Sequence, residues 1–329
     1  MMKDRILIFI AVVVLILLPL LFSNPYYINI LTQFAIFAVF ALSLNFIVGY
    51  IGEISFGHAA YFGLGAYFTA LISQNFGTSY WISLIIAIML TGLIGMFVGF
   101  LTLRLQGVYF AIITLAFAEI FRLIISNLPS ITRGAMGLSV PSPNIPFTNV
   151  TFGDPLMTYY FVFGLMLLVI LFIKYVLETP FGKGVIAIRE GHLLASSIGV
   201  NVVKYKVITF TISTMIAALS GGLYGAFIGI LTPDLLSVHY TTEALLMVVV
   251  GGIGYLLGPL YGAFIFTVIP EFLWMSPEVQ LLVFGIILLL AVLFMPRGIA
   301  YILEQLKHKL ENVRQPKAKL ESNSEEMEG

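Results

Sequence analysis

Six ionisable side chains lie inside apolar stretches of this 329-residue chain, in which only 10% of the residues are charged. They are Glu53, His58, Glu119, Arg122, Glu243 and Glu271. A charge within a bilayer is costly, so such a group normally faces a cavity, a partner charge or the membrane surface. The chemistry of these residues could therefore serve a solute pathway, an ion site or a structural ion pair.

Four of the six have a structural explanation in their positions. Glu119 and Arg122 are three residues apart on an expected helix, close enough to pair on one face. We favour a neutralised internal ion pair there over a contact with substrate. Glu243 and Glu271 lie near the ends of their apolar segments, which favours solvated carboxylates at the membrane surface.

Glu53 and His58 fall within a glycine-rich break, 49-GYIGEISFGHAAYFGLGA-66, and a second break follows at 250-VGGIGYLLGPLYGA-263. Broken backbone at membrane depth is tolerated only where it is buried in protein or lines a water-filled cavity. The first break therefore lines a pathway, packs at a cytoplasmic gate, or is a solvated loop. The candidates for the pathway or gate are Asn45, Glu53, Ser55, His58, Gly251, Gly252 and Gly254. The echo of GYIG in GGIG is either the remnant of an internal repeat or chance glycine enrichment.

Signatures of catalysis and of nucleotide binding are absent from the sequence. There is no G-x-x-x-x-G-K-[ST] loop, no H-E-x-x-H and no G-x-S-x-G. The four histidines are scattered and there is no cysteine, which excludes thiol chemistry and cysteine metal sites. The formal net charge of +0 argues against a nucleic-acid partner. We therefore expect neither an enzyme nor a cofactor or metal bound by this chain.

The elements that position these residues are membrane helices. Hydrophobic residues make up 60% of the chain and the mean hydropathy is +1.05, more apolar surface than a soluble core could bury. We predict an all-α polytopic membrane protein of about 8–10 spans, since each crossing needs roughly 20 residues. The apolar segments are 6–22, 29–49, 58–73, 81–103, 107–126, 156–176, 206–230, 241–252, 256–270 and 278–295. We expect residues 1–300 to form the transmembrane domain and the polar tail 301–329 to be disordered.

The first run, Ile6 to Phe22, follows two bases but lacks a small-x-small cleavage site, so we interpret it as an uncleaved span. With the N-terminus in the cytoplasm, all of the sixteen bases except Arg122 and Arg133 lie in cytoplasmic loops or the tail. Both termini are then cytoplasmic. This orientation also requires an odd number of crossings between residues 241 and 295, which the second glycine-rich break permits.

A polar segment, 187-AIREGHLLASSIGVNVVKYK-206, interrupts the apolar chain on the predicted cytoplasmic side, within a loop of about 178–205. Ile188, Leu194, Ala195 and Ile198 recur at nearly helical spacing, and Gly199 is suited to end a helix. This pattern predicts a short helix with an apolar stripe. We favour docking against a partner over a plain solvated loop, which has little use for such a stripe.

Several blocks together resemble the permease subunits of bacterial ABC importers of the branched-chain amino acid class, the LivM-like subunits. They are 42-LSLNFIVGYIGEISFGHAAYFGLGAY-67, 107-GVYFAIITLAFAEIFR-122, 132-TRGAMGL-138, the coupling-loop residues between Arg189 and Lys206, and 248-VVVGGIGYLLGPLYGA-263. The order of the blocks makes the resemblance specific. Two residues depart from the family pattern: Arg133 stands where a second glycine is usual, and Leu194 where an alanine is common.

The resemblance implies a multi-pass protein of a bacterial or archaeal cytoplasmic (inner) membrane, acting in an ATP-driven importer. It implies a second related permease subunit, two cytoplasmic ATPase subunits that use ATP with Mg, and an extracytoplasmic solute-binding protein. The coupling residues toward the ATPase would be Arg189, Glu190, Leu194, Ala195, Ile198 and Gly199. Urea and short-chain amide permeases share most of these blocks, so the cargo stays open. The rival interpretation is a secondary transporter or channel without ATPases.

Overall fold

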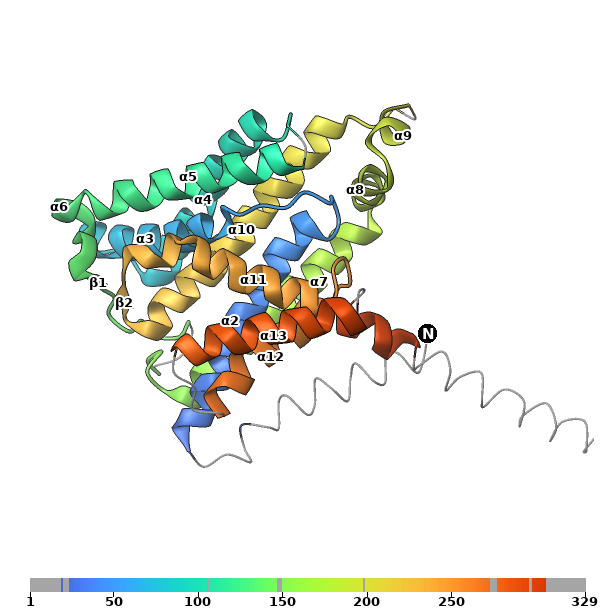
Figure 1. Ribbon diagram of the computed structural model, residues 1–329. Coiled ribbons are helices and arrows are strands. Elements are labelled where there is room, and N and C mark those ends of the chain that lie inside the picture. The colour runs from blue at the N-terminus through green and yellow to red at the C-terminus, as the bar shows by residue number, and fades with distance from the viewer. Residues whose placement is uncertain are drawn as a thin grey trace, which may run out of the picture.

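The protein is a bundle of helices in the computed structural model, which describes Pro19 and residues 24–105, 107–146, 150–197, 199–272, 277–295 and 298–305. The long helices, shown in Figure 1, are α2 (Pro25–Val48), α3 (His58–Phe76), α4 (Tyr80–Thr102), α5 (Val108–Ser126), α7 (Pro155–Glu178), α10 (Val202–Ile228), α11 (Val238–Gly251), α12 (Gly258–Phe272) and α13 (Pro277–Phe294). Among the described residues, α2, α4, α5, α7 and α10 are long and apolar enough to cross a membrane. The all-α polytopic prediction is confirmed, while the predicted span 6–22 and the tail beyond residue 305 lie outside the described residues.

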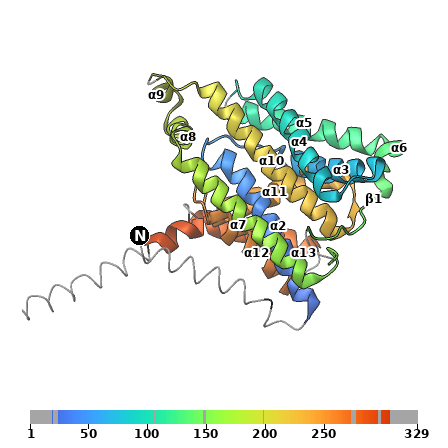
Figure 2. The same cartoon turned by 180° about the vertical axis from the view of Figure 1, so that it is seen from behind.

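Helix α2 forms the centre of the bundle. Its first turn is set by Pro25 and by Asn24, whose side chain accepts a hydrogen bond from the amide of Tyr26. Of its most apolar stretch, 94% of the residues are buried, because α7, α10, α11 and α12 pack around it. Figure 2 shows α7 running beside α2 when the bundle is seen from behind. A helix that is apolar on every side belongs inside a bundle, and α2 is placed accordingly.

Small residues allow α3 and α10 to approach each other closely. A side chain at Gly65 would meet the backbone of Ala218, and one at Gly221 would meet the carbonyl of Phe62. Small residues, such as those of the run 217-AALSGGLYGA-226, are what close approach of helices in a membrane requires. The short distance between the two backbones fixes α3 against α10.

The glycine-rich break at 252–257 separates α11 from α12, as predicted. The two helices have 14 and 15 residues and so are about 21 and 22 Å long, shorter than the roughly 30 Å of a bilayer core. They pack against each other and against α2. The break therefore joins two short neighbouring helices in place of one long one.

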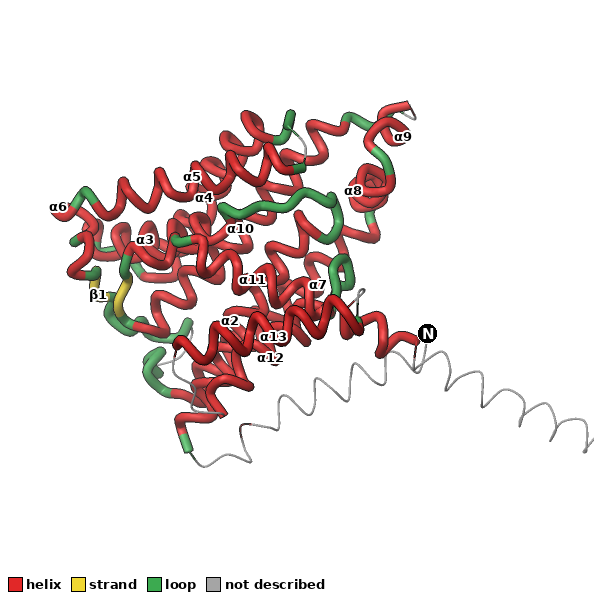
Figure 3. The backbone as a smooth tube through the Cα atoms, in the orientation of Figure 1, coloured by secondary structure: helices red, strands yellow, loops and turns green. Residues whose placement is uncertain are grey.

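The remaining elements lie at the two ends of the bundle. At one end are the helices α8 (Pro180–Glu190) and α9 (His192–Ser197), which we call the α8–α9 end. The opposite end, called the β1–β2 end, carries α6 (Pro129–Thr132), η1 (Gly134–Met136), η2 (Pro233–Leu236) and the antiparallel strands β1 (Leu138–Ser139) and β2 (Ile230–Leu231). Figure 3 shows the loops 49–57 and 252–257 on the same side of the bundle as α8. Residues 298–305 are helical, so the polar tail expected from Tyr301 starts within a helix.

Candidate functional site

The two glycine-rich breaks lie against each other at the α8–α9 end. Gly49, just after α2, is so close to Gly254 that a Cβ on Gly49 would lie 2.7 Å from the Gly254 nitrogen. Asn45, which is 1% exposed, donates from Nδ2 to the carbonyl of Tyr255 at 3.0 Å and accepts from the amide of Gly254 at 2.9 Å. The Asn45 side chain therefore clamps the turn after α11 to the last turns of α2.

Glycine is required in this turn for two reasons. Gly252 and Gly254 have φ angles of 126° and 80°, which side-chain-bearing residues rarely adopt. Gly251 is buried where a side chain would meet the carbonyl of Gly258 at the start of α12. The structure thus uses these glycines for close contact between backbones.

Arg189 covers both breaks from the last turn of α8. A Cβ atom added to Gly254 would have Nη1 of Arg189 as its nearest neighbour. A Cβ atom added to Gly52 would lie 3.6 Å from Cγ of Arg189. Helix α8 is positioned by Thr179, whose hydroxyl accepts a hydrogen bond from the amide of Gly182 at 3.3 Å. One arginine thereby connects the predicted coupling loop with the loops after α2 and α11.

Glu53 is the centre of a buried network, and the interpretation of a solvated loop is wrong. The residue is 2% exposed, and its Oε1 atom lies 2.5 Å from Nζ of Lys206, which is 1% exposed. Its Oε2 atom accepts a hydrogen bond from the amide of Gly107, the N-terminal cap of α5, at 3.1 Å. A buried carboxylate normally needs such a partner charge and hydrogen bonds. Glu53 therefore ties the loop 49–57 to the first turns of α5 and α10.

His192, the first residue of α9, adds a titratable group to this network. Its Nε2 atom lies 3.9 Å from Oε1 of Glu53, and its side chain is 32% exposed. Burial lowers the pKa of His192, the charge of Lys206 lowers it further, and Glu53 acts in the opposite direction. The imidazole therefore favours its neutral form beside the ion pair.

His58 and Ser55 are fully buried between helices. The Nε2 atom of His58 is 2.9 Å from Oγ of Ser43 and 3.4 Å from Oγ of Ser213, and its ring stacks on Phe40. The Ser213 hydroxyl in turn donates to the carbonyl of Ser43. His58 thus holds α2, α3 and α10 together, whereas its Nδ1 atom and the Ser55 hydroxyl have no partner among the described residues.

The predicted coupling helix is two helices, and its apolar stripe is not a single face. The chain turns at Gly191 between α8 and α9, so residues on the two sides no longer share one periodicity. Ile188 and Ala195 point inward with exposures of 0% and 1%, while Leu194 is 73% exposed. The prediction that these three residues face one partner is therefore wrong.

The outward apolar surface of α9 consists of Leu193 and Leu194, which are 83% and 73% exposed. Glu190 is also exposed, at the end of α8. Gly199 ends α9 with a φ of 86°, and the amide of Val200 bonds to the Ala195 carbonyl at 3.1 Å, the pattern of a Schellman cap. Ile198, the remaining predicted coupling residue, lies outside the described residues.

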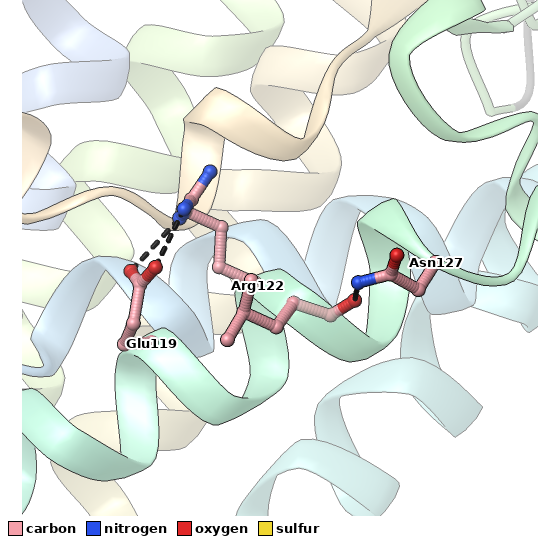
Figure 4. Close-up of polar contacts among 4 residues, drawn as sticks. Glu119, Arg122 and Asn127 are labelled. Carbon is pink, nitrogen blue, oxygen red and sulfur yellow. Dashed lines mark hydrogen bonds and ion pairs between the residues drawn. The ribbon is translucent and has the colours of Figure 1, made fainter.

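Glu119 and Arg122 do pair, but not inside the bundle. Arg122 donates from Nε to Oε2 of Glu119 at 2.8 Å and from Nη2 to Oε1 at 2.5 Å (Figure 4). The side chains are 29% exposed for Arg122 and 48% for Glu119. The pair therefore lies on an open face of α5, because the rest of the bundle packs on the other side of this helix.

Glu243 and Glu271 lie near the β1–β2 end, away from the network around Glu53. Glu271 accepts a hydrogen bond from the hydroxyl of Tyr26 at 2.7 Å. Glu243 is only 17% exposed and lies 3.5 Å from Nε2 of His239, so its interpretation as a solvated carboxylate is wrong. The described residues contain no group of three histidine, aspartate, glutamate or cysteine residues that could hold a metal ion.

Sequence reasoning missed the partners of the predicted residues. Lys206 appeared only as a cytoplasmic base at the start of the predicted apolar segment 206–230. In the structure it lies one turn inside α10, where a buried base needs a partner charge. Ser43 and Ser213 carry no signal, because their contact with His58 joins residues far apart in the chain.

Comparison with known proteins places this chain in a family. The family model described as "Branched-chain amino acid transport system / permease component" matches residues 26–292. The LivM protein of Salmonella typhimurium, a high-affinity branched-chain amino acid transport system permease protein, is 29% identical over 83% of this chain and 69% of its own length.

Two further relatives extend the comparison. A probable LivM of Methanocaldococcus jannaschii is 28% identical over 68% of this chain and 74% of its own length. The LivH permease protein of Salmonella typhimurium is 27% identical over 82% of this chain and 93% of its own length. The comparison with solved structures found no match. With most of its length matched by the family model, this chain belongs to the family of branched-chain amino acid transport system permease components.

Proposed function

We propose that this chain is a membrane-spanning subunit of an ATP-driven importer of branched-chain amino acids, and that partner ATPase subunits act on α8 and α9. The names of the LivM and LivH relatives support the cargo. The observation that carries the mechanism is the contact of Arg189 with the glycine turns after α2 and α11. A force on α8 reaches both turns through this one side chain.

The α8–α9 end is cytoplasmic in this proposal. Lys174, Lys183, Arg189 and Lys204 gather there, which fits the excess of bases on the cytoplasmic side of membrane proteins. Leu193 and Leu194 point away from the bundle and provide an apolar contact for an ATPase. ATP with Mg is bound and hydrolysed by that partner, since this chain has no phosphate-binding loop.

The movement passes from α9 to the loop 49–57 through the buried network. His192 on α9 and Lys206 on α10 both lie beside Glu53, so a shift of α9 changes the environment of this carboxylate. Glu53 in turn is bonded to the start of α5. Closure of the ATPases on ATP would thus move the cytoplasmic ends of α5 and α10 relative to α2. A bundle with two packed arrangements can convert such a shift into alternating access.

A second permease subunit, related to this one as LivH is to LivM, covers the open face of α5. The Glu119–Arg122 pair lies there among exposed apolar residues such as Leu115 and Leu123. Charges at membrane depth rarely face lipid, so a protein partner is the favoured cover for this face. A solute-binding protein delivers the cargo at the opposite side of the membrane.

Two measurements test the proposal: co-purification of an ATPase, and the dependence of uptake on ATP. The tagged chain is expressed with its operon neighbours, and uptake of L-leucine is measured in vesicles with and without ATP. We expect an ATPase to co-purify and uptake to require ATP. Uptake that persists after ATP depletion, in a preparation without an ATPase, would instead establish a secondary transporter or channel.

A further inference from the structure

The turn between α6 and η1, at the β1–β2 end, holds an arginine in a strained conformation. Arg133 has a φ of 59°, and in the described part of the chain it is the only residue other than glycine with a positive φ. Residues with side chains rarely adopt this left-handed conformation, which glycine adopts freely. Strained residues cluster at functional sites, so this outlier points to a role for the Arg133 side chain.

The backbone around Arg133 is fixed by hydrogen bonds. Its amide donates to the carbonyl of Pro129 at 3.1 Å. The hydroxyl of Thr132, which is 5% exposed, lies 2.6 Å from the carbonyl of Ile125 and accepts a hydrogen bond from the amide of Gly134 at 3.2 Å. The turn is thereby tied to the last residues of α5. Binding through a turn that is already ordered costs less entropy, so the turn is suited to contact a partner.

Arg133 carries an unpaired positive charge. Its side chain is exposed and has no ion-pair partner among the described residues, whereas Arg122, the other arginine at this end, is paired with Glu119. Lysine and arginine are normally concentrated on the cytoplasmic side of a membrane protein, and the β1–β2 end is the opposite side. The exposed acids Asp154 and Asp234 lie at the same end. A partner with a carboxylate is therefore attracted to Arg133 and repelled by these acids, which fixes where it binds.

Exposed apolar side chains lie on both sides of Arg133 in the chain. Met136 is 90% exposed, more than any other large hydrophobic residue that the structure describes, and Ile131 is 54% exposed. Methionine and arginine are both enriched at protein–protein interfaces. The composition of the turn is thus that of an interface with another protein.

The position of the turn favours a partner in water over a lipid. Helix α5 runs for 19 residues, or about 28 Å, which nearly equals the roughly 30 Å of a bilayer core. Arg133 follows this helix and α6, and so lies beyond the core on the outer side. Figures 1 and 2 show α6 projecting at the edge of the molecule. A soluble protein can reach this edge from outside the cell membrane.

We propose that the α6–η1 turn is a docking site for the extracytoplasmic solute-binding protein. The guanidinium of Arg133 donates to a carboxylate on the surface of that protein, a pairing that the two planar groups make with two parallel hydrogen bonds. Met136 and Ile131 pack against apolar side chains around the carboxylate. This assignment rests on the proposed importer function, which provides the solute-binding protein, and adds the surface that receives it.

The affinity of the solute-binding protein for the complex tests the docking site. The solute-binding protein encoded beside this chain is loaded with L-leucine, and its binding to the complete complex in nanodiscs is measured by biolayer interferometry. We expect Arg133→Gly to weaken the affinity about tenfold or more and to reduce its dependence on salt. Glycine also relieves the strain, so the thermal unfolding temperature should stay equal or rise. A purely structural role of Arg133 would instead lower it.

Met136→Ser tests the apolar part of the site. We expect this variant to weaken the affinity about fivefold or more, because it removes apolar surface that docking would bury. Met157→Ser is the matched control, since Met157 is 46% exposed at the start of α7, at the same end of the bundle. It should bind as the unaltered complex does.

Uptake by the unaltered complex separates this proposal from the importer function. Suppose that uptake requires ATP but Arg133→Gly binds the solute-binding protein with unchanged affinity, as it would if Arg133 contacted only lipid phosphate. That result overturns the docking site and leaves the importer function standing. Uptake that does not require ATP overturns the importer function, and the docking site with it.

Discussion

The Nζ atom of Lys206 lies 2.5 Å from Oε1 of Glu53, and both side chains are at most 3% exposed. The two residues are 153 positions apart in the chain and belong to different structural units. Glu53 lies in the loop after α2, whereas Lys206 lies at the start of α10, directly after the α8–α9 segment. The ion pair thus fixes the loop 49–57 to the part of the chain on which we propose that an ATPase acts.

Glu53→Gln should destabilise the protein strongly. It leaves the Lys206 ammonium buried without a counter-charge, and breaking a buried pair in this way costs about 3–5 kcal/mol. The thermal unfolding temperature of the purified chain, followed by size-exclusion chromatography after heating, provides the measurement.

The double variant Glu53→Gln/Lys206→Met is the control for this prediction. With both charges removed, most of the stability should return, because an apolar pair of similar size often replaces a buried ion pair without loss. If the double variant is as unstable as Glu53→Gln, the ion pair does not account for the effect.

His192 should make stability depend on pH. Its pKa in the folded protein lies below the ordinary value of 6.5 because of burial and the charge of Lys206. As the pH falls below 6.5, His192 takes up a proton more readily in the unfolded chain than in the folded one. Stability is therefore lost on acidification. Between about pH 7.5 and about pH 5.5, the unfolding temperature should fall more for the unaltered chain than for His192→Gln. Equal slopes would contradict the placement of His192 in the network.

Gly254→Ala should disrupt the turn after α11. Alanine at a φ of 80° is strained, and its Cβ would also collide with the Arg189 side chain and approach the carbonyl of Gly49. Gly77→Ala is the matched control, since Gly77 also has a positive φ but faces open space. We expect Gly77→Ala to lower the free energy of unfolding by about 1–2 kcal/mol at most. Gly254→Ala should lower it clearly more and should also lose uptake. Similar losses in both variants would show that the Arg189 contact is unimportant.

Replacing Leu193 and Leu194 by serine should release the ATPase without harming the fold. Both leucines are exposed in the isolated chain, so their removal costs little folding stability. Their burial against a partner contributes about 1.5 kcal/mol or more each, hence about a hundredfold in affinity together. The yield of co-purified ATPase is the measurement, with Leu303→Ser as the exposed-leucine control. Undiminished co-purification of the double variant would place the ATPase contact elsewhere.

The membrane helices could be predicted from the sequence because hydrophobic length and glycine-rich breaks are local signals. Even the end of α9 followed from Gly199, since a left-handed residue at a helix end is a local preference. The division of the coupling segment at Gly191 did not follow, because that glycine lies in a run whose spacing fits one helix. Once α8 and α9 separate, Ile188 and Leu194 point in different directions.

The functional contacts could be predicted only in part. Glu53, His58 and Asn45 stood out as polar residues in or beside a glycine-rich break. Their partners come from α2, α9, α10, the start of α5 and the loop after α11. Such pairings depend on how distant helices pack, which no single sequence reveals.

Site-specific photocrosslinking at Leu194 tests most directly the claim that an ATPase acts on the α8–α9 end. A benzophenone amino acid is placed at Leu194 or, as the control, at Leu168, which is 61% exposed on α7. In membranes that contain the operon partners, position 194 should crosslink to a subunit that carries a phosphate-binding loop, with a yield that changes on addition of ATP, and position 168 should not. The absence of that subunit from the Leu194 crosslinks, in membranes where uptake is intact, would contradict the account.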